Sequence, residues 1–199
     1  MSVLTEERIA ELLEPYLTVP QRLLPQLATY LDLLVRWNAK TNLTAIRNPE
    51  EMVRRHFGES LFAAQHLGET LPSELLDLGS GAGFPGLPIA LAHPNLPVTL
   101  AESQGKKSSF LREAVRTLAA ANVEVWAGRA EDLGKTFHTV AMRAVDDMAV
   151  AMKAAEPLAT NQLLLLTTRT PELPALFHVE QSIPLPASDT GVLVRAVRR

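Results

Sequence analysis

The sequence predicts an α/β fold in which a mostly parallel sheet ends in an antiparallel hairpin and follows a helical extension. In residues 1–70, apolar side chains recur at helical spacing throughout. From about residue 73, short and continuously apolar runs alternate with helical ones, which is typical of a parallel sheet covered on both faces. The last two apolar runs are separated by Asp189-Thr190-Gly191, which favours a hairpin. We therefore expect a helical extension over residues 1–70 and a second domain over residues 71–199.

The extension is expected to hold three helices. In the first two, leucine and tyrosine side chains lie three or four residues apart, and Pro20 and Pro25 mark where one helix gives way to the next. The third is expected to begin after Asn48, because asparagine caps a helix N-terminus and Pro49 suits the first turn. Its apolar positions are Met52, Phe57, Leu61 and Phe62.

The second domain is expected to alternate strands and helices. The expected parallel strands are 74–78, 98–101, 123–126, 139–142 and 163–167, with helices at 86–92, 106–121 and 146–158. The expected hairpin strands are 178–183 and 192–197. Right-handed crossovers between the parallel strands then give a doubly wound sheet.

Composition excludes several classes of protein. The chain has 199 residues, of which 47% are hydrophobic and 21% charged, as in a soluble globular protein. It has no cysteine, which excludes disulfides and thiolate chemistry, and its five histidines show no metal-ligand spacing. No apolar run suits a membrane helix, and the acidic N-terminus does not resemble a secretory signal. We expect a cytoplasmic protein without a metal, and the net charge of −3 means that nucleic-acid binding requires a local basic patch.

A glycine-rich loop, residues 79–86, follows the first expected strand and leads into a helix. Its four glycines allow a ligand to approach the backbone beyond the carboxyl end of the strand. Two cofactor classes fit. The spacing Gly81-x-Gly83-x-x-Gly86 matches a dinucleotide fingerprint. S-adenosylmethionine is favoured, because Asp77 suits a cationic ligand and because Pro85 and Pro88 withhold the N–H donors that a pyrophosphate needs. Asp77 can alternatively pair with the amides of the loop.

Other candidate residues follow the expected strands. Glu102 ends the second strand, where its two carboxylate oxygens can accept hydrogen bonds from both ribose hydroxyls, although a solvated acid is the alternative. Ala130 and Glu131 follow the third strand, in the loop that reaches an adenine in such folds, and a solvated charged turn is the equal alternative there. Arg143 ends the fourth strand, so we expect its side chain to face the site unless it is an ordinary surface arginine.

With these elements in place, the sequence resembles the bacterial 16S ribosomal RNA methyltransferase G family, also called the glucose-inhibited division protein B family. A parallel sheet ending in an antiparallel hairpin is likewise similar to the Rossmann-like class I methyltransferases. The resemblance covers nearly the whole chain. Its blocks are Trp37-Asn38-x-x-x-Asn42-Leu43-Thr44 with Arg47-x-Pro49-Glu50-Glu51-Met52 and His56, then Asp77 to Gly86, Glu102 to Lys107 with Phe110-Leu111, Arg129-Ala130-Glu131, and Arg143-Ala144.

The resemblance implies methyl transfer from S-adenosylmethionine to N7 of a guanosine, nucleotide 527, in the 530 loop of 16S ribosomal RNA. Together with the loop analysis, it gives these candidate cofactor-binding residues: Asp77, Gly79, Gly81, Phe84, Glu102, Ser103, Gln104, Ala130, Glu131 and Arg143. The candidate RNA-binding residues are Arg47, His56, Lys106, Lys107 and Arg129. The chain departs from the family pattern at Glu59, Phe84, Glu102 and Thr167-Thr168, where the last pair replaces Lys-Gly.

Guanine N7 carries a lone pair and no proton, so its methylation needs positioning more than a general base. Arg143 is the candidate catalytic residue, able to orient a phosphate or guanine O6 as well as to contact the cofactor. Trp37 can stack on a base, but its place on an apolar helix face favours a core role. The expected partner is 16S RNA or the small ribosomal subunit, bound by a monomer. The alternatives are a small-molecule methyltransferase, a non-catalytic nucleotide-binding assembly protein, and a dinucleotide oxidoreductase.

Overall fold

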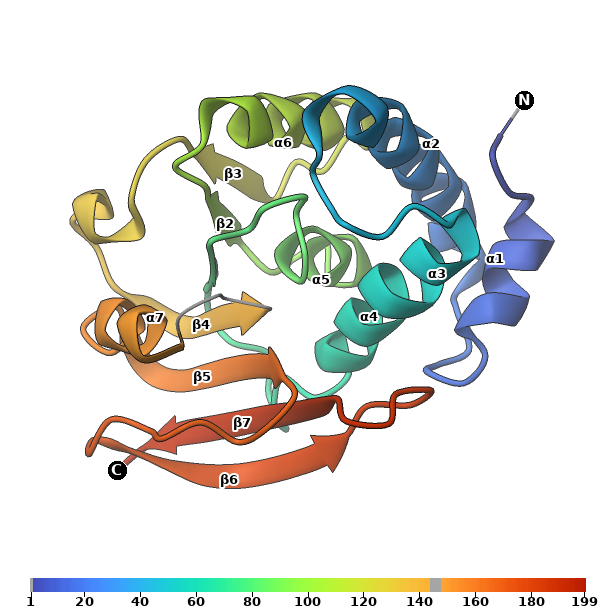
Figure 1. Cartoon of the computed structure of the whole chain (residues 1–199). Helices are drawn as coiled ribbons and strands as arrows, with labels where there is room; N and C mark the ends of the chain where they lie inside the picture. Colours follow the sequence, from blue (N-terminus) through green and yellow to red (C-terminus); the bar gives the residue numbers. More distant parts are fainter. Residues whose placement is uncertain (1, 144–147) are drawn as a thin grey trace.

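The computed structural model describes residues 2–143 and 148–199, with helices at the N-terminal end and a sheet after them (Figure 1). The helical part contains α1 (Glu6–Leu13), the 3₁₀ turn η1 (Gln21–Leu23), α2 (Leu24–Thr41), α3 (Pro49–Met52), the π-helical turn η2 (Val53–Gly58) and α4 (Glu59–Ala64). The rest contains β1 (Leu75–Leu78), α5 (Gly86–Ala92), β2 (Val98–Ala101), α6 (Gly105–Thr117), β3 (Val123–Trp126), the 3₁₀ turn η3 (Ala130–Leu133), β4 (Phe137–Arg143), α7 (Met148–Ala155), β5 (Ala159–Thr167), β6 (Phe177–Pro184) and β7 (Val192–Arg198).

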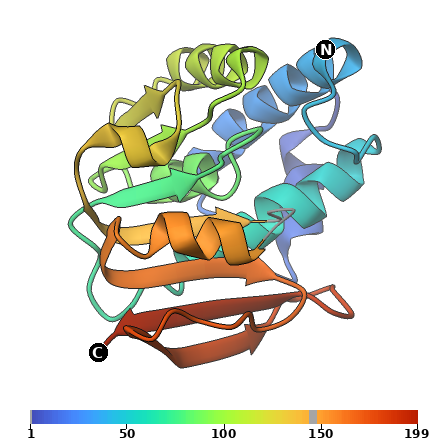
Figure 2. The same cartoon turned by 60° about the vertical axis from the view of Figure 1, so that its left-hand side comes forward.

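The strands form one sheet in the order β3-β2-β1-β4-β5-β7-β6. Pairing is parallel from β3 to β5, whereas β7 runs antiparallel to both β5 and β6. The predicted parallel sheet with an antiparallel hairpin is therefore confirmed, and Figure 2 shows the long β6–β7 hairpin at the lower edge of the sheet. Successive strands are added on one side of β1 up to β3 and on its other side from β4. This change of direction is the point at which open α/β sheets bind ligands.

Several element boundaries differ from those expected. Strand β5 begins at Ala159 instead of Leu163, because the pairing of Phe137 with Ala159 extends the ladder through Thr160 and Asn161, whose side chains are exposed. Helix α6 ends at Thr117 instead of residue 121, and Ala119 shortly after it has a φ of +51°. Helix α7 begins at Met148, and residues 146 and 147 of the expected helix lie outside the described residues. The spacing of hydrophobic residues therefore predicts that a strand or helix is present but not the residue at which it ends.

The third helix of the extension begins as expected. Asn48 Oδ1 accepts a hydrogen bond from the Glu51 amide at 3.1 Å, and Pro49 occupies the first turn. The π-helical turn η2 joins α3 to α4 without a break, and it was not predicted. A π turn holds more residues than an α turn, so it changes which side chains face inward. Three polar side chains around it are buried, namely those of His56, Glu59 and Ser60.

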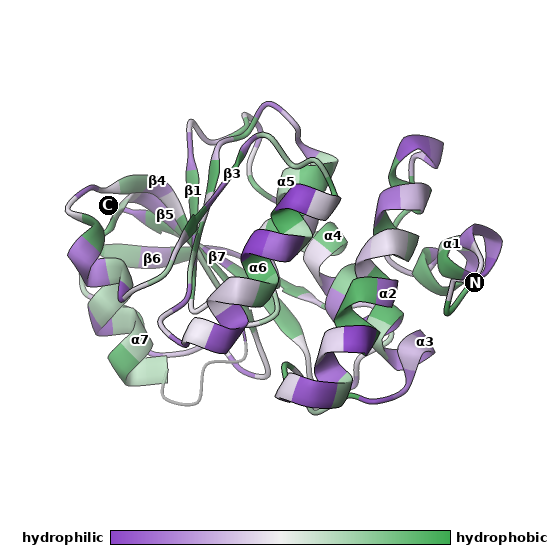
Figure 3. Cartoon of the chain, turned by 90° about the horizontal axis from the view of Figure 1, so that it is seen from above, coloured by the Kyte–Doolittle hydropathy of each residue, from purple (hydrophilic) through white to green (hydrophobic). Residues whose placement is uncertain are grey.

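One hydrophobic core joins the extension to the sheet. Tyr30 from α2, Phe57 from η2 and Phe110 from α6 are all almost fully buried within it. Figure 3 shows hydrophobic residues on the central strands and on α5, and hydrophilic residues along much of α6. The division into two domains near residue 70 stays a prediction, because the two parts share this core. In residues 2–143 and 148–199, no helix is both long and apolar enough to cross a membrane.

Candidate functional site

A cavity of about 280 Å³ opens at the carboxyl ends of β1, β2 and β3, beside α7. Its volume lies just below the range of about 300–1,000 Å³ that is common for small-molecule sites. Its lining combines apolar surface with carboxylates, a hydroxyl and a guanidinium. The lining residues are Leu78, Gly79, Ala101, Glu102, Ser103, Gly128, Arg129, Ala130, Glu131, Val150, Ala151 and Ala154. This first cavity therefore lies where the fold predicts a ligand.

The structure brings half of the predicted cofactor-binding residues into the first cavity. Those in its lining are Gly79, Glu102, Ser103, Ala130 and Glu131. Those outside its lining are Asp77, Gly81, Phe84, Gln104 and Arg143. The contribution of α7 to the lining was not predicted, because nothing in the sequence of that helix distinguishes a lining face from a core face.

The carboxylate of Glu102 is held by backbone amides of two loops, the glycine loop after β1 and the loop after β2. Its side chain is buried, and its Oε2 accepts a hydrogen bond from the Gly81 amide at 3.0 Å. Its Oε1 accepts one from the Gln104 amide at 2.7 Å. A carboxylate oxygen can accept two hydrogen bonds, so each oxygen keeps capacity for one more. The carboxylate is thereby oriented at the cavity without having to move on binding. Gly81 and Gln104 act on the site through this hydrogen bonding.

Asp77 points into the protein under the glycine loop. It is fully buried, and its Oδ2 accepts a hydrogen bond from the Gly86 amide at 2.9 Å, which is the pairing with loop amides that the sequence left open. A Cβ on Gly86 would lie 2.6 Å from the Asp77 Cβ, so only glycine fits there. Burial raises the pKa of Asp77 to about 7. A cofactor contact by Asp77 stays a prediction.

Phe84 faces the helical extension. Its ring is buried between that of Tyr30, stacked at 5.3 Å, and that of His56, stacked at 4.8 Å. The Tyr30 hydroxyl also donates a hydrogen bond to the Ala82 carbonyl in the same loop. The glycine loop is thus held on one side by β1 and on the other by α2 and η2. This packing is the role that the structure gives to Phe84.

A second cavity, of about 170 Å³, lies at the carboxyl ends of β4 and β5. It is lined by Arg55, Glu59, Arg143, Met148, Leu166, Thr167, Thr168, Leu185, Ser188, Thr190 and Gly191. The loop between β6 and β7 forms one wall of it, and no sequence signal had associated that loop with a site. Thr167 and Thr168, which replace the Lys-Gly of the family pattern, lie in the lining of this second cavity.

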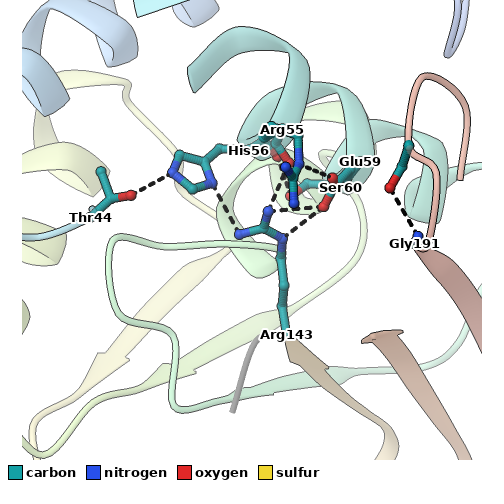
Figure 4. Close-up of polar contacts among 8 residues, drawn as sticks. Thr44, Arg55, His56, Glu59, Ser60, Arg143 and Gly191 are labelled. Atoms are coloured by element: carbon teal, nitrogen blue, oxygen red, sulfur yellow. Dashed lines mark hydrogen bonds and ion pairs between the residues drawn. The ribbon is translucent and has the colours of Figure 1, made fainter. Parts of the chain in front are cut away.

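Arg143 is held by several groups and is only 12% exposed (Figure 4). Its Nε and Nη2 donate to Glu59 Oε2 at 3.2 and 2.9 Å, and Nη2 also donates to the Arg55 carbonyl at 2.8 Å. Its Nη1 lies 3.0 Å from His56 Nδ1. Arg143 is therefore no ordinary surface arginine, and it lines the second cavity instead of the first. The pairing with Glu59 was not predicted, because in the sequence Glu59 stands out only as a departure from the family pattern.

The predicted RNA-binding residues lie in different environments. Lys106 is exposed at the start of α6, Lys107 is half-buried beside it, and Arg129 is exposed at the first cavity. Arg47 is exposed, and its guanidinium donates hydrogen bonds to the Asn38 carbonyl and to Asn42 Oδ1. His56 is buried, with both ring nitrogens next to protein groups.

The expectation that Trp37 has a core role fits its contacts. Its ring meets Phe110 edge to face at 5.7 Å, and its indole N–H donates to Glu113 Oε2 at 3.0 Å. These contacts join α2 to α6.

The amino-acid sequence of this chain matches a known protein family. The profile of the family described as rRNA small subunit methyltransferase G matches residues 23–173. The chain belongs to this family. A family member from Chloroflexus aggregans is 44% identical over 139 residues, which are 67% of this chain and 58% of that relative. One from Stenotrophomonas maltophilia is 42% identical over 172 residues, which are 82% of this chain and 80% of that relative.

The fold of this family member has solved counterparts. Magnesium protoporphyrin IX methyltransferase from Synechocystis PCC 6803, with S-adenosylhomocysteine bound, superposes with a TM-score of 0.62 at 16% identity, covering 86% of this chain and 94% of that one. At this identity the likeness concerns the fold, which is that of the class I methyltransferases.

Proposed function

We propose that this family member transfers a methyl group from S-adenosylmethionine to N7 of a guanosine in the 530 loop of 16S ribosomal RNA. The observation that carries the proposal is the pair of cavities at the carboxyl edge of one sheet, with Glu102 fixed in the first and Arg143 held at the second. Family membership supports ribosomal RNA as the substrate class. Because both cavities lie at the same edge of the sheet, a cofactor in the first and a nucleotide in the second can come into contact.

The first cavity suits an adenosyl cofactor. Glu102 keeps two hydrogen-bond positions for the ribose hydroxyls, and its fixed orientation lowers the entropic cost of binding. Apolar side chains of Leu78, Ala101 and Ala130 offer a surface for the flat adenine. A Cβ on Gly79 would have no atom within 4 Å, so this part of the loop leaves open space beside the ligand.

The reaction requires alignment. When bound, S-adenosylmethionine supplies an electrophilic methyl group. The N7 lone pair is available at neutral pH, so no residue of this chain has to remove a proton. Well-oriented reactants gain on the order of 7–11 kcal/mol over free ones. In this proposal Arg143, as the catalytic residue, donates a hydrogen bond to guanine O6 or to a phosphate and thereby holds N7 in line.

The RNA surface in this proposal borders the first cavity. Lys106 and Lys107 at the start of α6 and Arg129 at the cavity contact phosphates, and Arg47 contacts RNA from the extension. These side chains offset a net negative chain by placing positive charge locally. The proposal also includes a monomer that works in the cytoplasm. Light scattering coupled to gel filtration measures the oligomeric state.

Labelled methyl transfer tests the function. The protein is incubated with methyl-labelled S-adenosylmethionine and small ribosomal subunits, or 16S RNA, lacking the modification. We expect label in the RNA, and mass spectrometry of the digested product places it on one guanosine of the 530 loop. Binding of S-adenosylhomocysteine without label in RNA would show that the substrate is another molecule. If calorimetry shows tight binding of NAD and no binding of S-adenosylhomocysteine, the proposed cofactor is wrong.

A further inference from the structure

His56 lies between the glycine loop and Arg143. Its ring stacks on Phe84 of the loop, with ring centroids 4.8 Å apart. Its Nδ1 lies 3.0 Å from Arg143 Nη1, and its Nε2 lies 2.8 Å from Thr44 Oγ1 (Figure 4). One buried side chain therefore contacts the loop beside the first cavity, the arginine at the second cavity, and the loop between α2 and α3.

The chemistry of the neighbours fixes the state of this ring. A guanidinium carries only N–H donors, so Nδ1 must act as the acceptor for Arg143. The hydrogen of the neutral ring then lies on Nε2, which donates to the Thr44 hydroxyl oxygen. Burial, with Arg143 and Arg55 nearby, lowers the pKa of His56 to about 3, which agrees with a neutral ring. His56 thus presents one fixed lone pair to Arg143.

Four N–H groups of Arg143 donate hydrogen bonds to the neighbouring residues. Glu59 takes two, the Arg55 carbonyl takes one, and His56 takes one of the two on Nη1. A guanidinium has five. Among the residues that the structure describes, no group accepts the remaining hydrogen on Nη1. The atom that His56 holds is thus the one with a donor left for a ligand.

We propose that His56 is a positioning residue: its ring is held by Phe84 and Thr44, and its Nδ1 lone pair aims the remaining N–H on Arg143 Nη1 at the methyl-accepting nucleotide in the second cavity. The inference rests on the proposed function and deepens it. It replaces direct RNA contact by His56 with action through Arg143. It also explains why the cofactor loop and the substrate arginine share a neighbour, since a misplacement of about 1 Å at a reacting pair can cost on the order of 100-fold in rate.

Three substitutions separate the parts of the ring. His56→Asn keeps an acceptor bonded to Cγ, where Nδ1 is. His56→Gln moves the amide one bond further, to the place of Nε2. His56→Phe keeps an aromatic ring against Phe84 without any nitrogen. His66→Gln, at a half-buried histidine after α4, is the matched control.

Steady-state methyl transfer to RNA gives the first readout. We expect kcat to fall roughly 10- to 100-fold in His56→Gln and His56→Phe and clearly less in His56→Asn, with the affinity for S-adenosylhomocysteine kept within about threefold. His66→Gln keeps kcat within about twofold. Equal losses in all three variants, or a ranking that follows melting temperature, would overturn the positioning role.

A second readout does not depend on the substrate. In protein labelled with ¹⁵N-arginine, the Nε–H signal that Arg143→Lys removes is assigned to Arg143. We expect His56→Asn to keep this signal near its wild-type shift and His56→Gln to move or broaden it. An unchanged signal in His56→Gln would contradict the inference. If wild-type protein puts no label into RNA, the proposed function fails, and the NMR result then decides the inference by itself.

Discussion

The hydroxyl of Tyr30 occupies the space that a side chain on Gly83 would need. An ideal Cβ on Gly83 would lie 2.4 Å from the Tyr30 oxygen, and the φ of Gly83 is +91°. The same hydroxyl donates to the Ala82 carbonyl. A helix of the extension therefore determines the path of the glycine loop that borders the first cavity, and glycine is required there for both space and backbone conformation.

Gly83→Ala is expected to lower the free energy of unfolding by about 2–5 kcal/mol, because overpacking and an unfavourable φ add together. Gly134→Ala is the matched control, since Gly134 has a φ of +66° but open space around its Cβ position. It should cost only about 1–2 kcal/mol. Urea unfolding measures both. Adding Tyr30→Phe to Gly83→Ala should restore part of the loss, and no restoration would contradict the steric account.

Glu102→Gln is expected to weaken binding of S-adenosylhomocysteine by about 10- to 100-fold, since hydrogen bonds to charged groups are worth about 1.5–3 kcal/mol. The amide has one acceptor oxygen where the carboxylate has two, so one of the Gly81 and Gln104 amides loses its partner. Isothermal calorimetry measures the affinity. Glu124→Gln, on the exposed side of β3, is the control. Wild-type affinity in Glu102→Gln would remove this residue from the site.

Glu59→Gln is expected to cost about 3 kcal/mol of stability, because it leaves the nearly buried Arg143 cation without its carboxylate. Glu50→Gln breaks ion pairs of Glu50 with Arg8 and Arg54 whose side chains are 35–42% exposed. That control should cost clearly less stability than Glu59→Gln, because water and salt screen an exposed ion pair. Thermal unfolding of the two variants in the same buffer gives the comparison. Equal shifts in melting temperature would contradict the expectation that the buried ion pair contributes more stability than the exposed one.

Two buried groups give the unliganded protein opposite pH dependences. The pKa of His56 is lowered from 6.5 to about 3, so between these values only the unfolded chain binds the proton. Stability from this group is therefore lost as pH falls below 6.5, by about 2 kcal/mol from pH 7 to pH 5. The pKa of Asp77 is raised from 3.8 to about 7, so the folded chain binds the extra proton and stability rises by about 2 kcal/mol over the same interval.

When either group is substituted, the pH dependence of stability that comes from the other group is expected to become measurable. From pH 7 to pH 5, the free energy of unfolding should fall by about 2 kcal/mol in Asp77→Asn and rise by about 2 kcal/mol in His56→Asn, whereas the two effects nearly cancel in the wild-type protein. Urea unfolding at pH 5, 6 and 7 gives these values. Parallel profiles for the three proteins would show that neither pKa is shifted.

Lys106→Ala with Lys107→Ala is expected to reduce the salt dependence of RNA binding. Each lost phosphate contact lowers the slope of log K against log salt by about 0.7 for single-stranded RNA, so the double variant should lose about 1.4. Arg116→Ala, exposed at the far end of α6, is the control and should keep the slope. Filter binding of a fragment with the 530 loop, at several salt concentrations, measures it. An unchanged slope would move the RNA surface elsewhere.

Features of this protein that depend on neighbouring residues can be predicted from its amino-acid sequence. Asn48 capping, the glycine loop after β1 and the alternation of strands with helices follow from local conformational preference and hydrophobic period, and these gave the fold class and the first cavity. Thr167 and Thr168 line the second cavity because they lie at the carboxyl end of β5, and a substrate mouth there stays a prediction.

Where individual side chains point depends instead on contacts between residues far apart in the chain. Asp77 turns under the loop, Phe84 turns toward Tyr30, and Arg143 is held by Glu59 from a position 84 residues away. The physical reason is that a buried charge or ring takes the orientation that its long-range partners satisfy, and no spacing along the chain identifies those partners.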